Sequence, residues 1–341
     1  MNLPDDRYDR QARLPQVGPE GQRRLAASSV LLVGVGALGG CVADLLARAG
    51  VGRLRIADRD VVEPSNLQRQ TLFDEEDARE GAAKVEAAAR RLRRVNSSVR
   101  IEPLAMDLHA GNIAQAAEGC GLIVDGTDNA QTRYLINDFA IREGISWVYG
   151  GCVGVEGRAM ALVNGGPCLR CIFPTPPSPG ELPTCDVAGV LNAAATAVAS
   201  IEAAMALRIV VEGRTEPMLV ALDAWSMRVR SLDIANARRA DCVCCGRRRF
   251  EFLDSASAGD AVRLCGRASV QLRGHGAVDL TRAAQRLAAV GEVHAGEMLV
   301  RCRLHNEPGI SLSLFADGRL LVHGVRTVAA GRSIAAKYWG Y

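Results

Sequence analysis

The stretch Ser29-Val-Leu-Leu-Val-Gly34-Val-Gly36-Ala-Leu-Gly39 decides the fold class of this 341-residue chain. Its apolar part, Val30–Val33, is typical of a parallel strand buried on both faces, and the glycines after it have the spacing of a dinucleotide-binding turn. Asp58 ends a second expected strand about 20 residues further on, where such a unit places the acid that binds ribose. Many dehydrogenases share this pattern, so alone it indicates only a nucleotide-binding fold.

Strands and helices alternate through the first half of the chain. This alternation predicts a doubly wound, mostly parallel α/β sheet of the Rossmann type. Residues after Gly157 have a more β-rich pattern, and a long Ala-rich helix is expected to begin at Val187. The expected strands are Val30–Val33, Arg53–Asp58, Arg100–Ala105, Leu122–Asp125 and Ser146–Tyr149, and the expected helices are Ala37–Ala49, Gly81–Arg94 and Asn129–Glu143.

The composition changes after Cys245, and Phe252–Ala261 is small and polar like a linker. We therefore expect residues 1–250 to form one domain and residues 251–341 a small α+β domain. Asp317-Gly318 is a favourable hairpin turn between two of its strands. The elements expected there are the strands Ala268–Leu272, Met298–Leu304, Ile310–Phe315 and Leu320–Gly324, and the helices Leu280–Val290 and Ser333–Tyr338.

Composition excludes several classes of function. The chain has 41 basic and 38 acidic residues, a net charge of +3, which is too small to indicate a nucleic-acid partner. The apolar stretch from Val187 to Val211 carries Asn192, Glu202 and Arg208, so we expect a buried helix and no membrane span. Eleven cysteines without a signal peptide indicate a reducing compartment, and the expected location is the cytoplasm.

Charged side chains that could bind a nucleoside triphosphate are spread along the chain. It has no Gly-x-x-x-x-Gly-Lys-Ser/Thr motif, so phosphates would need other cations, and Arg10, Arg69 and Lys84 are candidates. Asp125 and Asp128 follow a short buried strand, which places Asp128 at the carboxyl edge of the sheet, where ligands of such folds bind. A carboxylate there could hold Mg²⁺ between phosphates.

Two cysteine pairs at Cys-x-x-Cys spacing are a candidate metal site. Four thiolates in a reducing compartment suit a tetrahedral structural Zn²⁺. The alternative is a redox-active pair accompanied by buried thiols. The four candidate ligands are Cys168, Cys171, Cys242 and Cys245.

These motifs together resemble the ThiF/MoeB/HesA family of ubiquitin-activating-like adenylyltransferases over about residues 5–246. The family pattern selects Cys242 and Cys245 as ligands and leaves Cys244 out. Ala37 stands where the family usually has a further glycine, a small change at a helix start. The motifs occur in family order: Arg7-Tyr-Asp-Arg10-Gln, Gly34-x-Gly36-x-x-Gly39, Asp58, Ser65-Asn-Leu-Gln-Arg69-Gln, Gly81-Ala-Ala-Lys84, Asp125-Gly-Thr-Asp128-Asn129 and the paired cysteines.

The resemblance implies that the chain uses ATP to adenylylate the C-terminal glycine of a ubiquitin-like sulfur carrier ending in Gly-Gly. Such machinery serves thiamin, molybdopterin and tRNA-thiolation pathways. By resemblance, Asp58 would hold the ribose, Asp128 would bind Mg²⁺, and Arg10 would reach the partner's nucleotide across a homodimer. The implied ATP contacts are Gly34, Gly36, Ala37, Gly39, Asp58, Asp60, Ser65, Asn66, Leu67, Gln68, Arg69, Lys84, Asp128 and Asn129.

Cys185 follows a Pro-rich loop and precedes the long helix, a position that can lower the pKa of a thiol. By resemblance it matches a cysteine that bonds covalently to the carrier or relays sulfur in some family members and is dispensable in others. Because the C-terminal part has no rhodanese-like active-site loop, we expect a separate sulfur donor, a cysteine desulfurase or a rhodanese. We also expect residues from about 255 to 341 to be separable and not needed for adenylylation.

Two other functions are compatible with part of the sequence. An NAD-dependent dehydrogenase would explain the glycines and Asp58, but it leaves Arg69, Lys84 and Asp128 without roles. A non-catalytic scaffold that binds the carrier would leave the whole phosphate-binding set unexplained.

Overall fold

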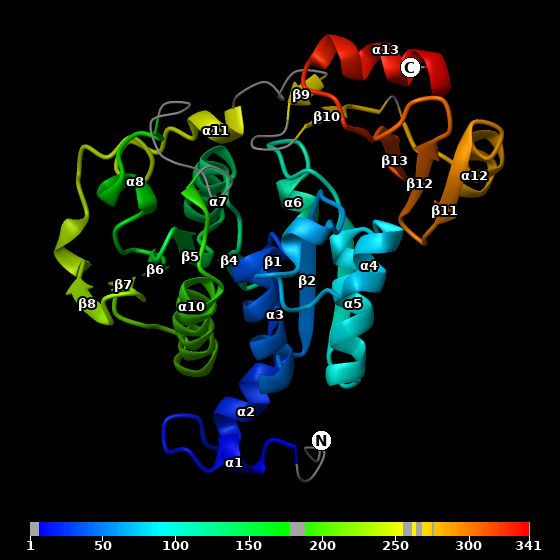
Figure 1. Ribbon diagram of the computed structural model, residues 1–341. Coiled ribbons are helices and arrows are strands. Elements are labelled where there is room, and N and C mark those ends of the chain that lie inside the picture. The colour runs from blue at the N-terminus through cyan, green and yellow to red at the C-terminus, as the bar shows by residue number, and fades with distance from the viewer. Residues whose placement is uncertain (1–6, 178–187, 255–260, 264–267, 275, 341) are drawn as a thin grey trace.

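The computed structural model describes residues 7–177, 188–254, 261–263, 268–274 and 276–340. Its larger sheet has eight strands in the order β3-β2-β1-β4-β5-β6-β7-β8 (Figure 1). The first five strands in this order run parallel, and β6, β7 and β8 are antiparallel. The strands are β1 (Ser29–Val33), β2 (Arg53–Asp58), β3 (Arg100–Ala105), β4 (Leu122–Asp125), β5 (Ser146–Val153), β6 (Glu156–Leu162), β7 (Met218–Asp223) and β8 (Arg228–Asp233).

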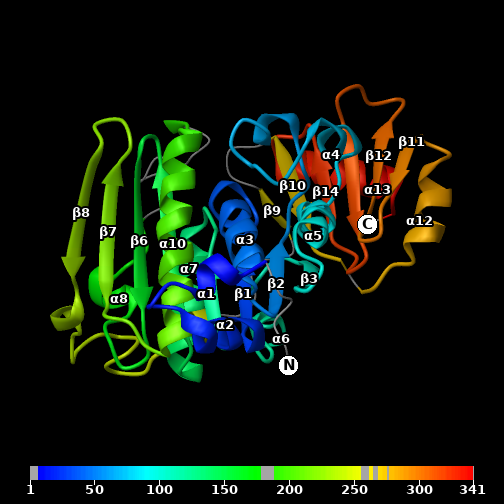
Figure 2. The same ribbon diagram turned by 90° about the horizontal axis from the view of Figure 1, so that it is seen from below.

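Helices cover both faces of this sheet, which confirms the predicted doubly wound fold (Figure 2). In β1, Val30 and Leu32 pack into one apolar layer and Leu31 and Val33 into the other, so the strand is apolar throughout. One face carries α2 (Gly18–Ala27), α3 (Ala37–Ala49), α5 (Lys84–Val95) and α10 (Asn192–Glu212), and the other carries α6 (Ile113–Ala116) and α7 (Ala130–Glu143). The short helices are α1 (Asp9–Ala12), η1 (Pro64–Asn66), α4 (Glu75–Glu80), α8 (Leu169–Ile172), η2 (Ala235–Ala237) and α11 (Glu251–Asp254).

Strand order reverses between β1 and β4, the neighbouring strands at the centre of the sheet. At such a switch point the connections leave toward opposite faces, and ligands bind in the crevice at the carboxyl ends of the strands. Gly34 follows β1 and Gly126 follows β4, so the predicted glycine loop lies at this crevice.

Helix α10 is, among the described residues, long and apolar enough by composition to cross a membrane. Half of the most apolar 18-residue stretch of this helix is buried within the protein, where α10 packs on α3, β5 and β6. The side chain of Glu202 on this helix is fully buried. These contacts are those of a core helix.

A second sheet of six antiparallel strands has the order β11-β12-β13-β14-β10-β9 (Figure 1). One face packs against its own two helices. Apolar side chains of the other face, including Phe315 and Leu321, join the core of the first sheet. The elements are β9 (Ala261–Arg263), β10 (Ser269–Leu272), α12 (Leu280–Leu287), β11 (Gly291–Ala295), β12 (Leu299–Leu304), β13 (Ser311–Phe315), β14 (Leu320–His323) and α13 (Val328–Tyr338).

Several predicted boundaries were wrong for identifiable reasons. Gly81, placed inside one helix, has a φ of +63° and ends α4, and α5 begins three residues later at Lys84. The long helix begins at Asn192, and Val187 lies outside the described residues. Helix α11 occupies the start of the expected linker, and strands β9 and β11 were not predicted. The Asp317-Gly318 hairpin is confirmed, with a φ of +84° at the glycine.

Candidate active site

The glycine loop packs so closely that side chains are excluded from it. Gly34 has a φ of +86°, and a Cβ on it would lie 2.7 Å from the carbonyl oxygen of Gly126. A Cβ on Gly39 would lie 1.9 Å from the carbonyl oxygen of Gly34. At Gly36, which precedes α3, the nearest described atom to such a Cβ is Gln70 Nε2 at 3.7 Å. The start of α3 is therefore accessible to an anion that its backbone N–H groups can bind.

Asp58 is held beside this loop by backbone donors. One carboxylate oxygen accepts a hydrogen bond from the Val35 N–H and the other from the Asp60 N–H, both at 2.8 Å. Burial raises the pKa of Asp58, and the positive charge of Lys84 opposes this shift. A carboxylate fixed at the end of β2 next to the glycine turn has the position of a ribose-binding acid.

Lys84 brings a nearly buried positive charge to the same edge of the sheet. Its side chain is 4% exposed, and Nζ lies 3.3 Å from Asp60 Oδ2. The Lys84 backbone N–H also donates to the Asp60 carbonyl at 3.0 Å. The start of α5 is thereby tied to the segment that carries Asp58.

The segment that follows β2, around η1, carries several of the predicted ATP-binding residues. The buried Asn66 accepts a hydrogen bond from the Glu63 N–H at 3.1 Å, which fixes η1. Arg69 is half-buried and donates from Nη1 to the Ser65 carbonyl at 2.8 Å, while Ser65 and Gln68 are exposed and Leu67 is half-buried. Gln70 was not predicted as a site residue. It is buried, and its Oε1 has no hydrogen-bond partner among the described residues.

The acidic stretch that begins at the last residue of β4 contains one buried and one exposed carboxylate. Buried Asp125 accepts hydrogen bonds from Thr127 and lies 3.1 Å from Arg133 Nε. Arg133, which sequence reasoning missed, also donates to the Gly150 carbonyl at 2.8 Å. Asp128 is exposed, and its charge acts on Arg133 and on Arg59. The neighbouring Asn129 caps α7 by accepting a hydrogen bond from the Gln131 N–H.

Arg10 does not belong to the nucleotide crevice of its own chain. It is exposed on α1, at the bottom of the molecule in Figure 1. Tyr8 packs against Gly50, and Gln11 Nε2 donates to the Ala49 carbonyl at 3.0 Å, so α1 lies at the far end of α3. The 13 residues of α3 separate this end from the glycine loop by about 20 Å. Cys185 lies outside the described residues.

The four predicted cysteines form one buried cluster that could hold a metal ion. Their Sγ atoms all lie within 4.8 Å of one another. The Sγ atoms of Cys168 and Cys242 are 3.6 Å apart, and those of Cys171 and Cys245 are 3.4 Å apart. Four sulfurs around a tetrahedral Zn²⁺ would be separated by about 3.8 Å, so these distances fit such an ion.

The environment of the cluster disfavours four charged thiolates without a cation. Burial raises the pKa of the Cys245 thiol, and the charge of Cys168 acts in the same direction. Cys244 is fully buried beside the cluster, but its Sγ accepts a hydrogen bond from Asn137 Nδ2 at 3.3 Å. The group of thiols whose Sγ atoms all lie within 4.8 Å of one another comprises the four candidate ligands and does not include Cys244.

This fold and site define a nucleotide-binding α/β protein with a four-cysteine cluster. The chain belongs to the ThiF family, whose model matches residues 8–244.

Two relatives describe this family further. The chain is 40% identical over 338 residues to the sulfur carrier protein ThiS adenylyltransferase of Bacillus subtilis, covering 98% of this chain and 99% of that protein. It is 40% identical over 243 residues to the SAMP-activating enzyme E1 of Haloferax volcanii, covering 71% of this chain and 88% of that protein.

Solved structures support the fold. Escherichia coli MccB, in a structure with MccA-N7isoASN, matches with a TM-score of 0.63 at 21% identity, covering 72% of this chain and 75% of MccB. At this identity the likeness concerns the fold alone. The family and the relatives together identify the chain as an adenylyltransferase. They favour neither the dehydrogenase hypothesis nor the scaffold hypothesis.

Proposed function

We propose that the chain uses ATP to activate the C-terminal glycine of a ubiquitin-like sulfur carrier of the ThiS or MoaD type. The observation that carries this proposal is the similarity to the Bacillus subtilis ThiS adenylyltransferase, which extends over nearly the whole length of both chains. The geometry supports it, because a nearly buried lysine and an accessible helix start lie beside a ribose-type acid. Thiamin, molybdopterin and tRNA-thiolation pathways are the candidate settings.

The reaction needs positioning more than proton transfer. The carrier carboxylate attacks the α-phosphorus of ATP, a new O–P bond forms, and the bond to the β-phosphate oxygen breaks to release pyrophosphate. Two anions must approach, and charge builds up on the leaving group, so fixed cations lower the barrier. We assign this task to Arg69 and Lys84, the ribose to Asp58 and the phosphate backbone contacts to the loop of Gly34, Gly36 and Gly39.

Two metal ions complete the proposal. Exposed Asp128 at the carboxyl edge of the sheet would hold Mg²⁺, which supplies charge neutralisation for the phosphates. Zn²⁺ would bind the four cysteines, and with sulfur in all four positions it would have a structural role. The buried sulfurs at tetrahedral spacing support zinc over a redox pair.

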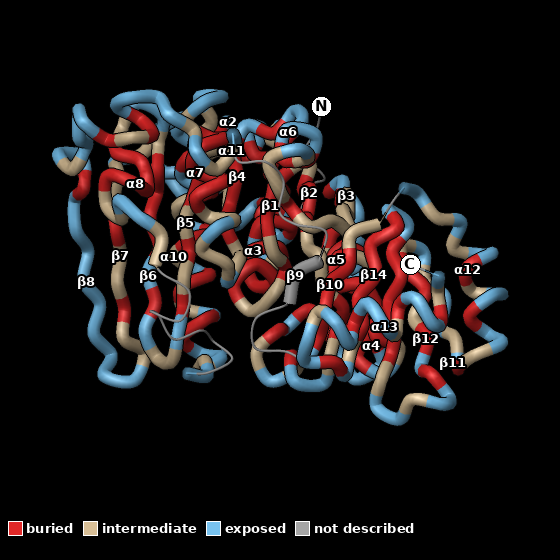
Figure 3. The backbone as a smooth tube through the Cα atoms, turned by 90° about the horizontal axis from the view of Figure 1, so that it is seen from above, coloured by how far each residue is buried: buried red, intermediate tan, exposed pale blue. Residues whose placement is uncertain are grey.

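The remaining assignments concern partners. We propose a homodimer in which Arg10 serves the site of the partner subunit, because α1 lies far from its own glycine loop. The outermost strand β8 is exposed throughout (Figure 3), and the turn that precedes it exposes Trp225 and Met227. This edge, whose strand also carries Arg228 and Arg230, would receive the carrier. Cys185 would capture the activated carrier or pass sulfur to it. A separate cysteine desulfurase or rhodanese would supply that sulfur, in the cytoplasm.

Mass spectrometry of the carrier tests this function directly. A Gly-Gly-ending carrier incubated with the protein, ATP and Mg²⁺ should gain the mass of an AMP group. A carrier lacking its last glycine is the control and should remain unmodified. An unmodified intact carrier, with NAD reduced or oxidised instead, would overturn the proposal.

A further inference from the structure

A buried arginine of the second sheet contacts the first sheet at the carboxyl ends of β2 and β3. Arg319 on the β13–β14 hairpin is 4% exposed, and its guanidinium lies over the Phe315 ring at 3.8 Å. Its Nη1 donates to the Arg59 carbonyl at 2.5 Å, and its Nη2 donates to the Ala105 carbonyl at 3.2 Å. Arg59 directly follows β2, and Ala105 is the last residue of β3. Both lie more than 200 residues before Arg319 in the chain.

Arg59 lies between Asp58 and Asp60, so the position of its peptide affects both carboxylates. The Asp60 N–H donates to Asp58, and the Asp60 carboxylate pairs with Lys84. A shift of the Arg59 peptide would therefore move both the ribose-type acid and the partner of the buried lysine. Arg319 holds this peptide at its carbonyl oxygen.

The Arg59 side chain is held by the same sheet through a second connection. Its Nη1 lies 3.2 Å from Asp107 Oδ1, and the other oxygen of Asp107 accepts a hydrogen bond from Gln271 Nε2 at 2.7 Å. Gln271 is a buried residue of β10. Both the carbonyl and the guanidinium of Arg59 are thus fixed by contacts that originate in the C-terminal sheet.

Burial of a guanidinium costs free energy unless hydrogen bonds and opposite charges compensate it, so the partners of Arg319 matter. Burial lowers the pKa of Arg319, and the charges of Asp317, Asp107 and Asp60 oppose that shift. The guanidinium is therefore stabilised by acids of the nucleotide-binding part as well as by its own hairpin.

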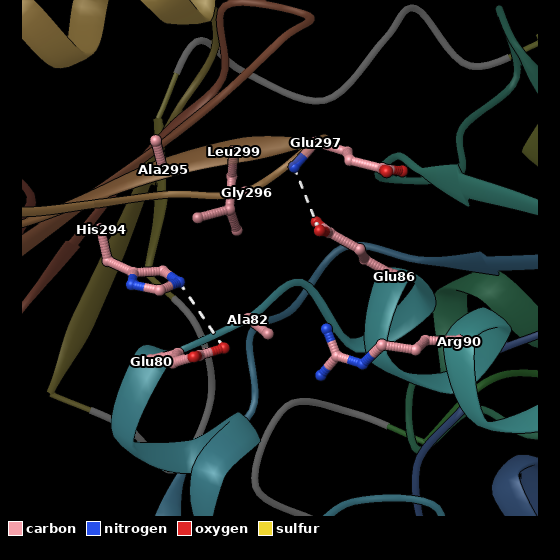
Figure 4. A pocket seen from close by; sticks show the side chains of 9 residues that line it. All are labelled: Glu80, Ala82, Glu86, Arg90, His294, Ala295, Gly296, Glu297 and Leu299. Atoms are coloured by element: carbon pink, nitrogen blue, oxygen red, sulfur yellow. Dashed lines mark hydrogen bonds and ion pairs between the residues drawn. The ribbon is translucent and has the colours of Figure 1, made fainter.

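Other contacts join the two sheets without Arg319. Glu86 of α5 accepts hydrogen bonds from the N–H groups of Glu297 and Met298, beside a cavity of about 390 Å³ (Figure 4). Arg303 Nη2 donates to the Arg79 carbonyl at 2.7 Å. Because these contacts do not involve Arg319, removal of its guanidinium should leave the two sheets packed against each other. The effect of the substitution should then be confined to the Asp58–Asp60 segment.

We infer that Arg319 is a positioning residue for ATP, through which the C-terminal sheet fixes the Asp58–Asp60 segment. The inference rests on the proposed function, because that function assigns Asp58 and Lys84 to the nucleotide. It differs from the expectation of a dispensable C-terminal part. A chain that ends before β9 should bind ATP weakly even when its first sheet is folded.

The variant Arg319→Met tests this, with Arg286→Met as the matched control. Arg286 is exposed in the same C-terminal part and also lies over an aromatic ring, that of Trp339 at 4.8 Å. Loss of hydrogen bonds from a charged group should raise the KM for ATP about tenfold in Arg319→Met, with kcat and the KM for the carrier little changed. Arg319→Lys, which keeps a donor, should recover part of the affinity, and Arg286→Met should match the unaltered chain.

Hydrogen exchange of the unaltered chain covers the case in which Arg319→Met does not fold. A non-hydrolysable ATP analogue should increase the protection of the β13–β14 amides. Unchanged protection there, or unchanged ATP affinity in folded Arg319→Met, would overturn the inference alone. An unaltered chain that binds no ATP at all would overturn the proposed function and this inference together.

Discussion

Lys84 is unusual in this chain because lysine itself is rare in it. Of 41 basic residues only two are lysine, Lys84 and Lys337. Lys84 is nearly buried against Asp60, whereas Lys337 is 59% exposed and pairs with Glu307 on the surface. A compact ammonium group on a flexible stem can turn from its carboxylate partner to a bound phosphate, which a rigid guanidinium does less readily.

Replacing each lysine separately tests this role. Lys84→Met should lower the rate of ATP–pyrophosphate exchange by about 10²-fold or more, because a fixed cation is lost from the charged transition state. Lys337→Met should leave the rate unchanged. Thermal unfolding of both variants shows whether the loss arises from misfolding, and exchange at the normal rate by folded Lys84→Met would exclude the assignment.

Glu202 is a second buried titratable group with a measurable signature. It is fully buried on α10, and neither carboxyl oxygen has a hydrogen-bond partner among the described residues. Burial raises the pKa of Glu202 well above its usual value, and the negative charge of Asp125 adds to the shift. The folded protein therefore keeps this carboxyl protonated at a pH where the unfolded chain has already released the proton.

This difference makes stability depend on pH with a definite sign. Between the unfolded and the raised folded pKa, each increase in pH favours the unfolded chain. Glu202→Gln, which is permanently neutral, should match the unaltered Tm near pH 4.5 and exceed it increasingly toward pH 8. Glu212→Gln, at an exposed position on the same helix, should show no such trend. A constant Tm difference across this range would contradict the account.

At the residue scale, the sequence predicted the residues whose spacing is local. Gly34, Gly39 and Asp58 follow from one strand–turn–helix pattern, and the structure places them together. Gln70, which lies near Gly36, and Arg133, which pairs with Asp125, were missed as site residues, because no local pattern marks a buried amide or an arginine on a helix. The burial of Gln70 and the contacts of Arg133 with Asp125 and the Gly150 carbonyl are visible only in the fold.

At the element scale, the cysteine cluster fastens two distant segments to each other. Cys168 precedes α8 and Cys171 lies within it, and Cys242 and Cys245 follow η2, 74 residues later in the chain. A metal at this point would restrain a long loop, so it should contribute directly to the stability of the β-rich half.

Substitution of single cysteines tests this site. Cys168→Ser should lose the bound metal and lower Tm, because an incomplete tetrahedral set binds weakly. Cys244→Ser, at a buried neighbour that donates no ligand, should keep the metal. Elemental analysis of fresh protein should give about one zinc per chain. A chain without metal, or equal metal loss in both variants, would contradict the four-cysteine assignment.

Element boundaries illustrate why some of the fold could not be predicted. The continuously apolar β1 was placed to within one residue and α3 at its observed bounds, because both have a clear hydrophobic pattern of their own. The split between α4 and α5 at Gly81 depends on a left-handed glycine in a packed turn. Strand β11 is largely exposed, so its sequence lacks the alternation that identifies a half-buried strand.

At the scale of the whole molecule, the two sheets share part of one core, with Phe315 and Leu321 packed among residues of the first. Sequence composition suggested a boundary near residue 250 but contained no information on these contacts. The relative from Bacillus subtilis matches both parts, over 98% of this chain.

The proposed homodimer makes a prediction about mixed subunits. If Arg10 acts on the partner's nucleotide, a chain with Arg10→Ala and a chain with Asp128→Ala should each be inactive alone. Mixing them should restore one working site per heterodimer, measured as exchange activity after subunit exchange. A mixture as inactive as its components, together with a monomer in sedimentation, would exclude the composite site.

ATP–pyrophosphate exchange in the presence of the carrier is the most direct test of the central claim. The unaltered chain, supplied with Mg²⁺ and a carrier ending in Gly-Gly, should incorporate labelled pyrophosphate into ATP. The exchange should stop when the carrier is omitted or lacks its last glycine, because the reversible step forms an acyl-adenylate on that carboxylate. Exchange that does not depend on the carrier, or no exchange with any Gly-Gly-ending carrier, would contradict the account.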